Sequence, residues 1–143
     1  MAEEKKIRVF IADDFDILRQ VIQLVLERTE DIETVGEAPH LRDALEKVKK
    51  LQPDVILMND YIPPTDSARA AKLFRELDIT AAILIISMHA EPHLIQRSLT
   101  NGANGFMHKD EMGTLLMEAV RKVHNKEQYL SPKAEDALMY DDD

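Results

Sequence analysis

The hydrophobic pattern of the chain alternates between short apolar runs and longer segments with helical spacing. Five of the runs have the length of a β-strand and are rich in β-branched residues. Three of them are apolar nearly throughout, as expected for central strands that are buried on both faces of a parallel sheet. The expected strands are Ile7–Ala12, Glu33–Ala38, Asp54–Asn59, Ala82–Ser87 and the weaker Gly105–His108.

The segments between these runs predict five amphipathic helices, because apolar residues recur in them every three or four positions. The turn signals agree with this division. Pro53 precedes the third strand, Pro63-Pro64 follows it as a turn, and Asn101-Gly102 ends the fourth helix. The expected helices cover residues 17–26, 41–51, 67–77, 92–100 and 112–123.

Strands that alternate with helices predict a doubly wound α/β fold. Short connections require right-handed crossovers, which place helices on both faces of a five-stranded parallel sheet. A chain of 143 residues can bury one core, and we expect one domain at residues 5–125. Residues 126–143 hold six acidic and two basic side chains, so they predict a linker and a solvated acidic tail that ends in a disordered Asp141–Asp143.

Composition excludes several classes of function. The chain has no cysteine, so it can form no disulfide, thiolate metal site or thiol nucleophile. Its formal net charge of -9 repels a nucleic-acid backbone, and we expect no direct nucleic-acid binding. No apolar run reaches the roughly 20 residues that span a bilayer, and the first residues lack a signal peptide, so a cytoplasmic chain without membrane contact is expected. Dinucleotide binding is disfavoured because no G-x-G-x-x-G follows the first strand.

Polar residues gather where the expected strands end. The first strand runs into Asp13-Asp14, the third ends at Asn59, the fourth ends at Ser87 and the fifth runs into Lys109. Ligands of doubly wound sheets bind outside the carboxyl ends of the strands, so this edge is the candidate site. Each residue alone would be an ordinary surface group, and only their joint placement indicates a function.

These motifs resemble the CheY-like receiver domains of two-component response regulators. The resemblance covers about residues 5–132, and Lys109-Asp110 with Tyr129-Leu-Ser-Pro resembles the LuxR/NarL-type subgroup in particular. Several spaced motifs in the right order make it more specific than any one motif. They are Ile7-Arg-Val-Phe-Ile-Ala-Asp-Asp, Pro53-Asp-Val-Ile-Leu-Met-Asn59 followed by Pro63, Ser87 after an apolar strand, and the run from Asn101 to Asp110.

The resemblance implies a flavodoxin-like sheet with strand order 2-1-3-4-5 and a phosphorylation site at position 59. In the family, an aspartate there takes a phosphoryl group from a sensor histidine kinase. Lys109 and Ser87 match the residues that bind the phosphoryl oxygens. The Mg²⁺ ligands would be Asp13, Asp14, residue 59 and the backbone carbonyl of Tyr61.

The resemblance also implies a switch and an output. Ser87 and Phe106 match the switch residues, and the readout surface would be formed by the fourth helix, fifth strand and fifth helix. A homodimer and control of transcription agree with the subgroup. Its DNA-binding helix-turn-helix domain needs on the order of 60 residues after residue 132. Too few residues remain for it here, so no DNA-binding domain is expected in this chain.

The chain departs from the family pattern at the phosphoacceptor. Asn59 is fixed by two spacings, five residues after Asp54 and four before Pro63. An amide is a poor nucleophile and a neutral metal ligand, so we expect an unphosphorylated receiver with a weakened Mg²⁺ site and no enzyme activity. Asp60 should point away from the pocket, because neighbouring strand side chains alternate between faces. Ser67 stands where the family usually has glycine.

Two other functions stay open at this point. A pseudo-receiver would bind partners without phosphorylation, and an intact Mg²⁺ affinity would argue against it. A metal-dependent phosphatase is suggested by Asp14-Phe-Asp16, which resembles the Asp-x-Asp of haloacid-dehalogenase-type enzymes. Asp16 is better explained as the N-cap of the first helix. His89 and His93 are spaced like a zinc pair but lack the glutamate of H-E-x-x-H, so surface histidines are the simpler interpretation.

Overall fold

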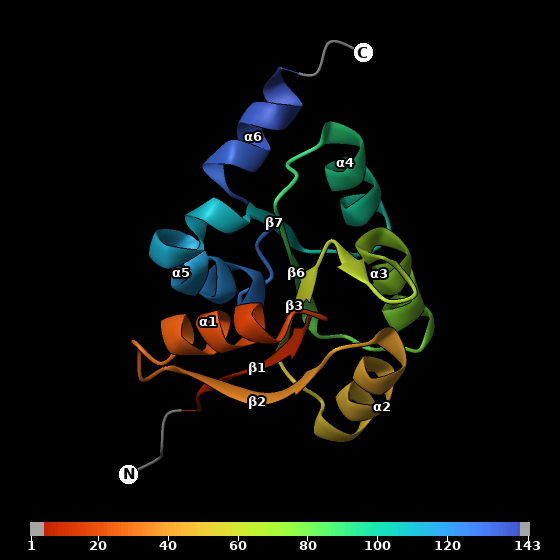
Figure 1. The fold of residues 1–143 in the computed structure, drawn as a ribbon, viewed down its shortest axis with the longest axis vertical. Coiled ribbons are helices and arrows are strands. Elements are labelled where there is room, and N and C mark those ends of the chain that lie inside the picture. Colours follow the sequence, from red (N-terminus) through yellow and green to blue (C-terminus); the bar gives the residue numbers. More distant parts are fainter. Residues whose placement is uncertain (1–4, 141–143) are drawn as a thin grey trace.

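The computed structural model describes residues 5–140, in which strands and helices alternate along the chain (Figure 1). The expected run Asp141–Asp143 lies outside the described residues. The principal strands are β1 (Ile7–Ala12), β2 (Ile32–Ala38), β3 (Val55–Asn59), β6 (Ala82–Ser87) and β7 (Gly105–His108). The principal helices are α1 (Asp16–Leu26), α2 (Leu41–Leu51), α3 (Ser67–Glu76), α4 (Pro92–Thr100) and α5 (Met112–His124).

The main sheet is parallel and has the order β2-β1-β3-β6-β7-β8. Its first five strands confirm the predicted order 2-1-3-4-5. The sixth strand, β8 (Tyr129–Leu130), was not predicted. The short strands β4 (Tyr61–Ile62) and β5 (Thr65–Asp66) form a separate antiparallel pair around the predicted Pro63-Pro64 turn.

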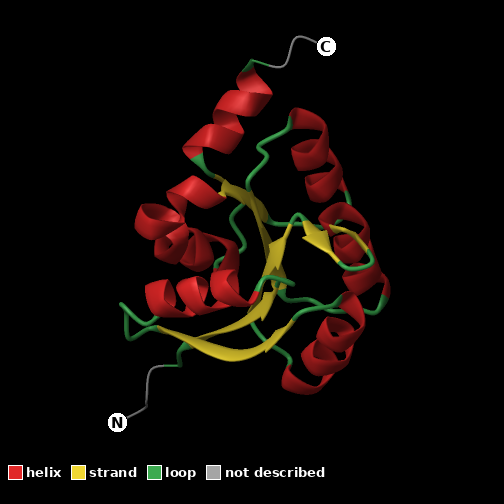
Figure 2. Ribbon diagram, in the orientation of Figure 1, coloured by secondary structure: helices red, strands yellow, loops and turns green. Residues whose placement is uncertain are grey.

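Helices cover both faces of the sheet, as the pattern predicted (Figure 2). Helices α1 and α5 lie on one face, and α2, α3 and α4 lie on the other (Figure 1). Alternating side chains of each strand feed the two cores. Val55 and Leu57 of β3 join the core beneath α1 and α5, whereas Ile56 and Met58 join the core beneath the other three helices.

The segment predicted as a linker and solvated tail is folded, so the packed unit extends beyond residue 125. β8 pairs with β7, and α6 (Pro132–Met139) follows it. Ala134 is fully buried, and Leu130, Ala137 and Leu138 pack against the same core. The acidic residues of α6 lie on its exposed side. Net charge misled the prediction because a helix can bury a narrow apolar face while its charges stay in water.

Between residues 5 and 140, no helix has both the length and the apolar character that a membrane crossing requires.

Candidate functional site

The carboxyl ends of four neighbouring strands bring the predicted site residues to one edge of the sheet. Asn59 and Ser87 are the last residues of β3 and β6, while Asp13 and Lys109 directly follow β1 and β7. These four strands are consecutive neighbours in the sheet. The local environment of each side chain decides what the edge can do.

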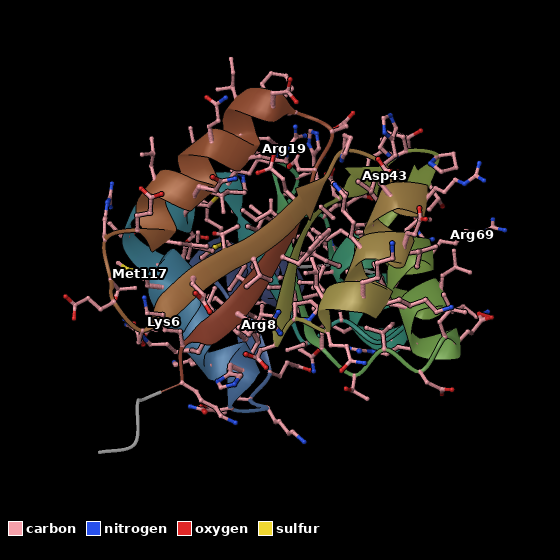
Figure 3. The ribbon with its side chains drawn as sticks, turned by 90° about the horizontal axis from the view of Figure 1, so that it is seen from below. Lys6, Arg8, Arg19, Asp43, Arg69 and Met117 are labelled. Atoms are coloured by element: carbon pink, nitrogen blue, oxygen red, sulfur yellow. The ribbon has the colours of Figure 1, made fainter. Side chains whose placement is uncertain are left out.

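Asp13 is held in a well-fixed loop between β1 and α1. Its side chain is 2% exposed, and its Oδ1 accepts a hydrogen bond from the Phe15 backbone N–H at 2.9 Å. Its backbone carbonyl accepts a hydrogen bond from the guanidinium of Arg19 at 2.5 Å. Arg19 belongs to the first turn of α1 (Figure 3) and also pairs with Glu37 at 2.8 Å. The loop therefore presents the Asp13 carboxyl from a rigid frame.

The prediction that Asp16 caps α1 is wrong. The N-cap residue is Phe15, and Asp16 is the first helical residue. Its carboxylate pairs with Arg19 one turn later. Asp13 makes the local turn at this point, because its own carboxyl accepts the Phe15 N–H. With Asp16 committed to Arg19, the Asp-x-Asp interpretation loses its second carboxylate.

The Asp13 carboxyl lies in surroundings that favour a cation. Burial raises its pKa above the ordinary value, and the neighbouring charge of Asp14 acts in the same direction. The Phe15 hydrogen bond and the positive charges of Lys109 and Arg19 oppose this without overcoming it. Lys109 thus lies close enough to Asp13 for their charges to interact. A divalent ion beside Asp13 would relieve the cost of its buried negative charge.

Asn59 is half-buried, and only the nitrogen of its side-chain amide makes a hydrogen bond to the residues that the structure describes. Its Nδ2 donates a hydrogen bond to the backbone carbonyl of Tyr61 at 3.0 Å. The opposite orientation would place two acceptor oxygens against each other, so Oδ1 must be the atom that faces elsewhere. Within residues 5–140 this buried Oδ1 has no hydrogen-bond partner. An orphaned oxygen is a fitting ligand for a hard cation, although it carries no charge.

The donor groups at this edge are of the kinds that Mg²⁺ takes as ligands. Asp13 and Asp14 would supply carboxylates, and Asn59 would supply a neutral oxygen in place of a third one. In the described part of the chain, no group of three or more His, Cys, Asp or Glu side chains is placed to hold a metal ion. Tyr61, the predicted source of a carbonyl ligand, already accepts the Asn59 amide. The residues fit Mg²⁺, with fewer charges than a three-carboxylate site would provide.

Ser87 makes a contact that the sequence analysis missed. Its Oγ donates a hydrogen bond to Asp60 Oδ2 at 2.6 Å and accepts one from the His89 backbone N–H at 2.8 Å. Register explains the first bond. Asn59 of β3 pairs with Ile86 of β6, so the residues that follow them, Asp60 and Ser87, lie opposite each other.

The alternation of β3 continues through this pair. By this alternation Asn59 lies on the same face of the sheet as Leu57, the face covered by α1 and α5. Asp60 lies on the same face as Met58, which is covered by α2, α3 and α4. Asp60 therefore points away from Asn59, as expected. The Ser87 hydroxyl nevertheless contacts Asp60, so Asp60 points away from Asn59 but reaches another of the predicted site residues. Alternation along β3 indicates the face on which Asp60 lies, but the contact with Ser87 also depends on the register of β3 against β6.

The remaining predicted residues are placed as follows. Lys109 begins the 3₁₀ helix η1 (Lys109–Glu111), which joins β7 to α5. Phe106, the predicted aromatic switch residue, is fully buried in β7 and pairs with Ile85 and Leu130. Ser67 is also buried, and its backbone N–H donates to the Asp60 carbonyl at 2.8 Å. Ser67 thus fixes the backbone of Asp60, whose carboxylate accepts the hydrogen bond from Ser87.

A sequence model of the response regulator receiver domain matches residues 9–121. The chain belongs to this family. It is 34% identical over 118 residues to the transcriptional regulatory protein NarL of Mycobacterium tuberculosis, covering 82% of this chain and 55% of that protein. It is 32% identical to the oxygen regulatory protein NreC of Staphylococcus carnosus, covering 92% of this chain and 61% of that protein. The chain thus spans little more than half the length of these relatives.

Solved receiver domains share the fold. The signal receiver domain of NarL from M. tuberculosis superimposes with a TM-score of 0.80 at 33% identity, covering 85% of this chain and 98% of that one. The isolated receiver domain of RcsB from Salmonella enterica serovar Typhimurium, with phosphomimetic BeF3⁻, gives 0.86 at 21% identity, over 94% and 99% of the two chains. This chain is therefore a NarL/LuxR-type receiver domain of two-component signalling. Receiver domains are signalling modules, and they generally bind Mg²⁺.

Proposed function

We propose that this receiver domain is held in the unphosphorylated state by Asn59, and that a parent form with aspartate at this position accepts a phosphoryl group from a sensor histidine kinase. The observation that carries the proposal is the amide at the end of β3. Asn59 Nδ2 is engaged by the Tyr61 carbonyl, and Oδ1 belongs to a neutral amide. Such an oxygen is a poor nucleophile toward phosphorus.

The chemistry of the parent form follows from the surrounding groups. A carboxylate oxygen at position 59 would form a bond to phosphorus while the bond between phosphorus and the donor breaks, and the donor would leave with the electron pair. Mg²⁺, when bound, would neutralise charge on the phosphoryl group. Asp13 and Asp14 would hold the ion, and Lys109 would supply a further positive charge on the same edge. Asn59 weakens this arrangement by removing one negative charge.

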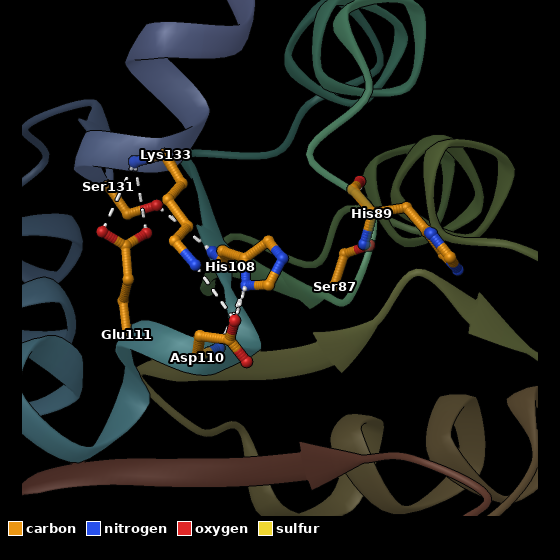
Figure 4. A network of polar contacts seen from close by, with 7 residues as sticks. All are labelled: Ser87, His89, His108, Asp110, Glu111, Ser131 and Lys133. Carbon is orange, nitrogen blue, oxygen red and sulfur yellow. Dashed lines mark hydrogen bonds and ion pairs between the residues drawn. The ribbon is translucent and has the colours of Figure 1, made fainter.

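We propose that the output passes through α6. The readout surface expected from the family is formed by α4, β7 and α5, and α6 lies beside α4 at this end of the molecule (Figure 1). A polar network ties α6 to the residues that follow Lys109 (Figure 4). Lys133 Nζ pairs with Asp110 at 3.0 Å, and the Lys133 N–H donates to Glu111. A shift of Lys109 toward a phosphoryl group would therefore pull on the start of α6.

A phosphorylation-independent receiver is the second candidate. It is favoured by the internal satisfaction of two groups that would otherwise meet phosphate, because Ser87 is bonded to Asp60 and Asn59 is bonded to Tyr61. Such a module would act by binding partners, including a second copy of itself. Mg²⁺ binding as tight as in the Asn59→Asp variant would count against this candidate.

The test is intact-mass measurement after incubation with Mg²⁺ and acetyl phosphate. This chain, Asn59→Asp and Asn59→Ala are treated in parallel. A gain of about 80 Da in Asn59→Asp alone, with release of acetate, supports the proposal. If none of the three proteins gains mass, the phosphorylation-independent receiver becomes the better supported candidate. A gain in the unaltered chain or in Asn59→Ala would show that another residue accepts phosphate and would overturn the role of Asn59.

A further inference from the structure

Ser87 is a predicted phosphate-binding group whose hydrogen already has an anionic acceptor. A hydroxyl carries one proton, and three oxygen or nitrogen atoms surround this one. Asp60 Oδ2 is 2.6 Å away, the His89 carbonyl is 3.1 Å away, and the His89 N–H donates to Oγ at 2.8 Å. The short distance and the charge of the carboxylate assign the proton to Asp60.

The geometry of the two strands makes this bond difficult to avoid. β3 and β6 are paired in parallel register up to Asn59 and Ile86, so Asp60 emerges directly opposite Ser87. The Asp60 backbone is fixed in turn by the Ser67 N–H. Ser87 is fully buried, so water does not compete for its proton. A hydrogen bond from a buried hydroxyl to a carboxylate is charge-assisted, and such bonds are among the stronger ones in proteins.

We propose that Asp60 is a positioning residue that competes with a phosphoryl group at position 59 for the proton of Ser87. The inference rests on the proposed function, because it concerns the same site. For Ser87 to donate to a phosphoryl oxygen, it must first leave the Asp60 carboxylate. Asp60 therefore raises the free-energy cost of moving Ser87 toward a phosphoryl group. While position 59 is unmodified, it keeps the Ser87 hydroxyl in one orientation.

Beryllofluoride binding tests the competition without a kinase. In the Asn59→Asp background with Mg²⁺, the dissociation constant is measured by calorimetry for Asp60→Ala, Asp60→Asn, Ser87→Ala and the pair Asp60→Ala with Ser87→Ala. Asp60→Ala should tighten binding about tenfold, because Ser87 no longer has to break a charged hydrogen bond. Asp60→Asn, which keeps an acceptor oxygen without its charge, should give a smaller gain.

Ser87→Ala separates the proposed competition from simple charge repulsion. If Asp60 acts through Ser87, Asp60→Ala should change the affinity less than about twofold once the hydroxyl is gone. An equal gain with and without Ser87 would show that the Asp60 charge only repels the ligand, and the inference would fail. It would fail equally if Asp60→Ala left the affinity unchanged while Ser87 is present.

A measurement on the unaltered chain keeps this inference separate from the proposed function. The His89 amide donates to Ser87 Oγ, so its NMR signal reports on the position of the hydroxyl. Asp60→Ala should shift this signal and speed its hydrogen exchange, whereas Asp110→Ala, which removes an exposed carboxylate bonded to Lys133, should not. If Asn59→Asp binds no beryllofluoride, the proposed function fails. In that case the NMR signal of the His89 amide still tests whether Asp60 positions Ser87. If Asp60→Ala leaves this signal unchanged, the inference about Asp60 is refuted.

Discussion

At the scale of single residues, Asp13 carries a clear electrostatic cost. Its carboxyl is buried, its pKa is raised, and the nearby positive charges do not offset the lost hydration. A raised pKa means that the folded state binds a proton more tightly than the unfolded chain does. The resulting stability is fully present below the unfolded value of 3.8 and is lost as the pH rises through the higher folded value. At neutral pH the ionised Asp13 therefore opposes folding unless a cation is bound.

Replacing Asp13 by asparagine should stabilise the metal-free protein. The amide oxygen can still accept the Phe15 N–H, and no buried charge remains. Thermal unfolding at neutral pH in EDTA should show an increase in Tm of about 3 °C, and the difference from the unaltered chain should shrink as the pH falls toward 4. The stabilisation by Mg²⁺ should disappear in the variant.

Asp14→Asn is the control for this prediction, because Asp14 is exposed. It should leave the metal-free Tm nearly unchanged while weakening the effect of Mg²⁺. A lower Tm for Asp13→Asn in EDTA would contradict the argument, since it would mean that the charge of Asp13 stabilises the fold through Lys109 and Arg19.

At the scale of elements, the hydrophobic pattern predicted what depends on periodicity within one segment. β1, β6 and β7 begin and end at the predicted residues, and α3 ends one residue early. Contacts that depend on pairing between segments were not predictable in the same way. The Asp60–Ser87 bond requires the register of β3 against β6, which neither strand encodes alone. The few apolar residues of α6 indicate a buried face only once a neighbouring surface is known.

Arg75 shows how such a contact holds elements together. It lies near the end of α3, and its guanidinium donates to the carbonyls of Ile79, Ala81 and Gly102 at 2.7 to 3.1 Å. It also donates to Asn104 Oδ1 at 2.8 Å. One side chain thus joins the loop that enters β6 to the loop that enters β7. Burial lowers the pKa of Arg75, and the cost of desolvation is offset by these hydrogen bonds.

Arg75→Ala should lower the free energy of unfolding by about 3 kcal/mol, because it leaves several partly buried carbonyls without a donor. Urea denaturation followed by circular dichroism measures the change. Arg69→Ala is the matched control, since Arg69 lies on the same helix with an exposed side chain (Figure 3) and should cost less than about 0.5 kcal/mol. Equal losses in the two variants would show that helix propensity or net charge, and not the loop contacts, sets the stability.

At the scale of the whole molecule, the folded unit includes the segment that follows the sequence-matched region. The family match ends at residue 121, whereas β8 and α6 continue the sheet and the core up to residue 139. β8 covers the edge of β7, which would otherwise present unpaired backbone groups. α6 covers apolar surface between β7 and α4. Helix α6 is therefore bound to the same part of the molecule that carries Lys109 and Phe106.

Ala134 is the residue on which this attachment can be tested. It is fully buried on the face of α6 that meets the core, so Ala134→Asp would bury an unpaired carboxylate. The variant should lose about 3 kcal/mol of stability, or release α6 so that its amides exchange freely. Hydrogen exchange followed by mass spectrometry distinguishes the two results, and in both of them protection should fall in α6 and in the adjoining part of α4.

Met139→Asp places the same charge in the same helix at a position that is 71% exposed, and it should change neither stability nor exchange. If Ala134→Asp behaved like this control, α6 would contribute nothing to the fold, and the domain would end near residue 125 as the charge pattern suggested. If protection is lost in α4 as well as in α6, the two helices form one cooperative unit. A displacement of Lys109 or Ser87 could then be transmitted through α4 and α6 to the groups that α6 contacts, without any movement of the central sheet.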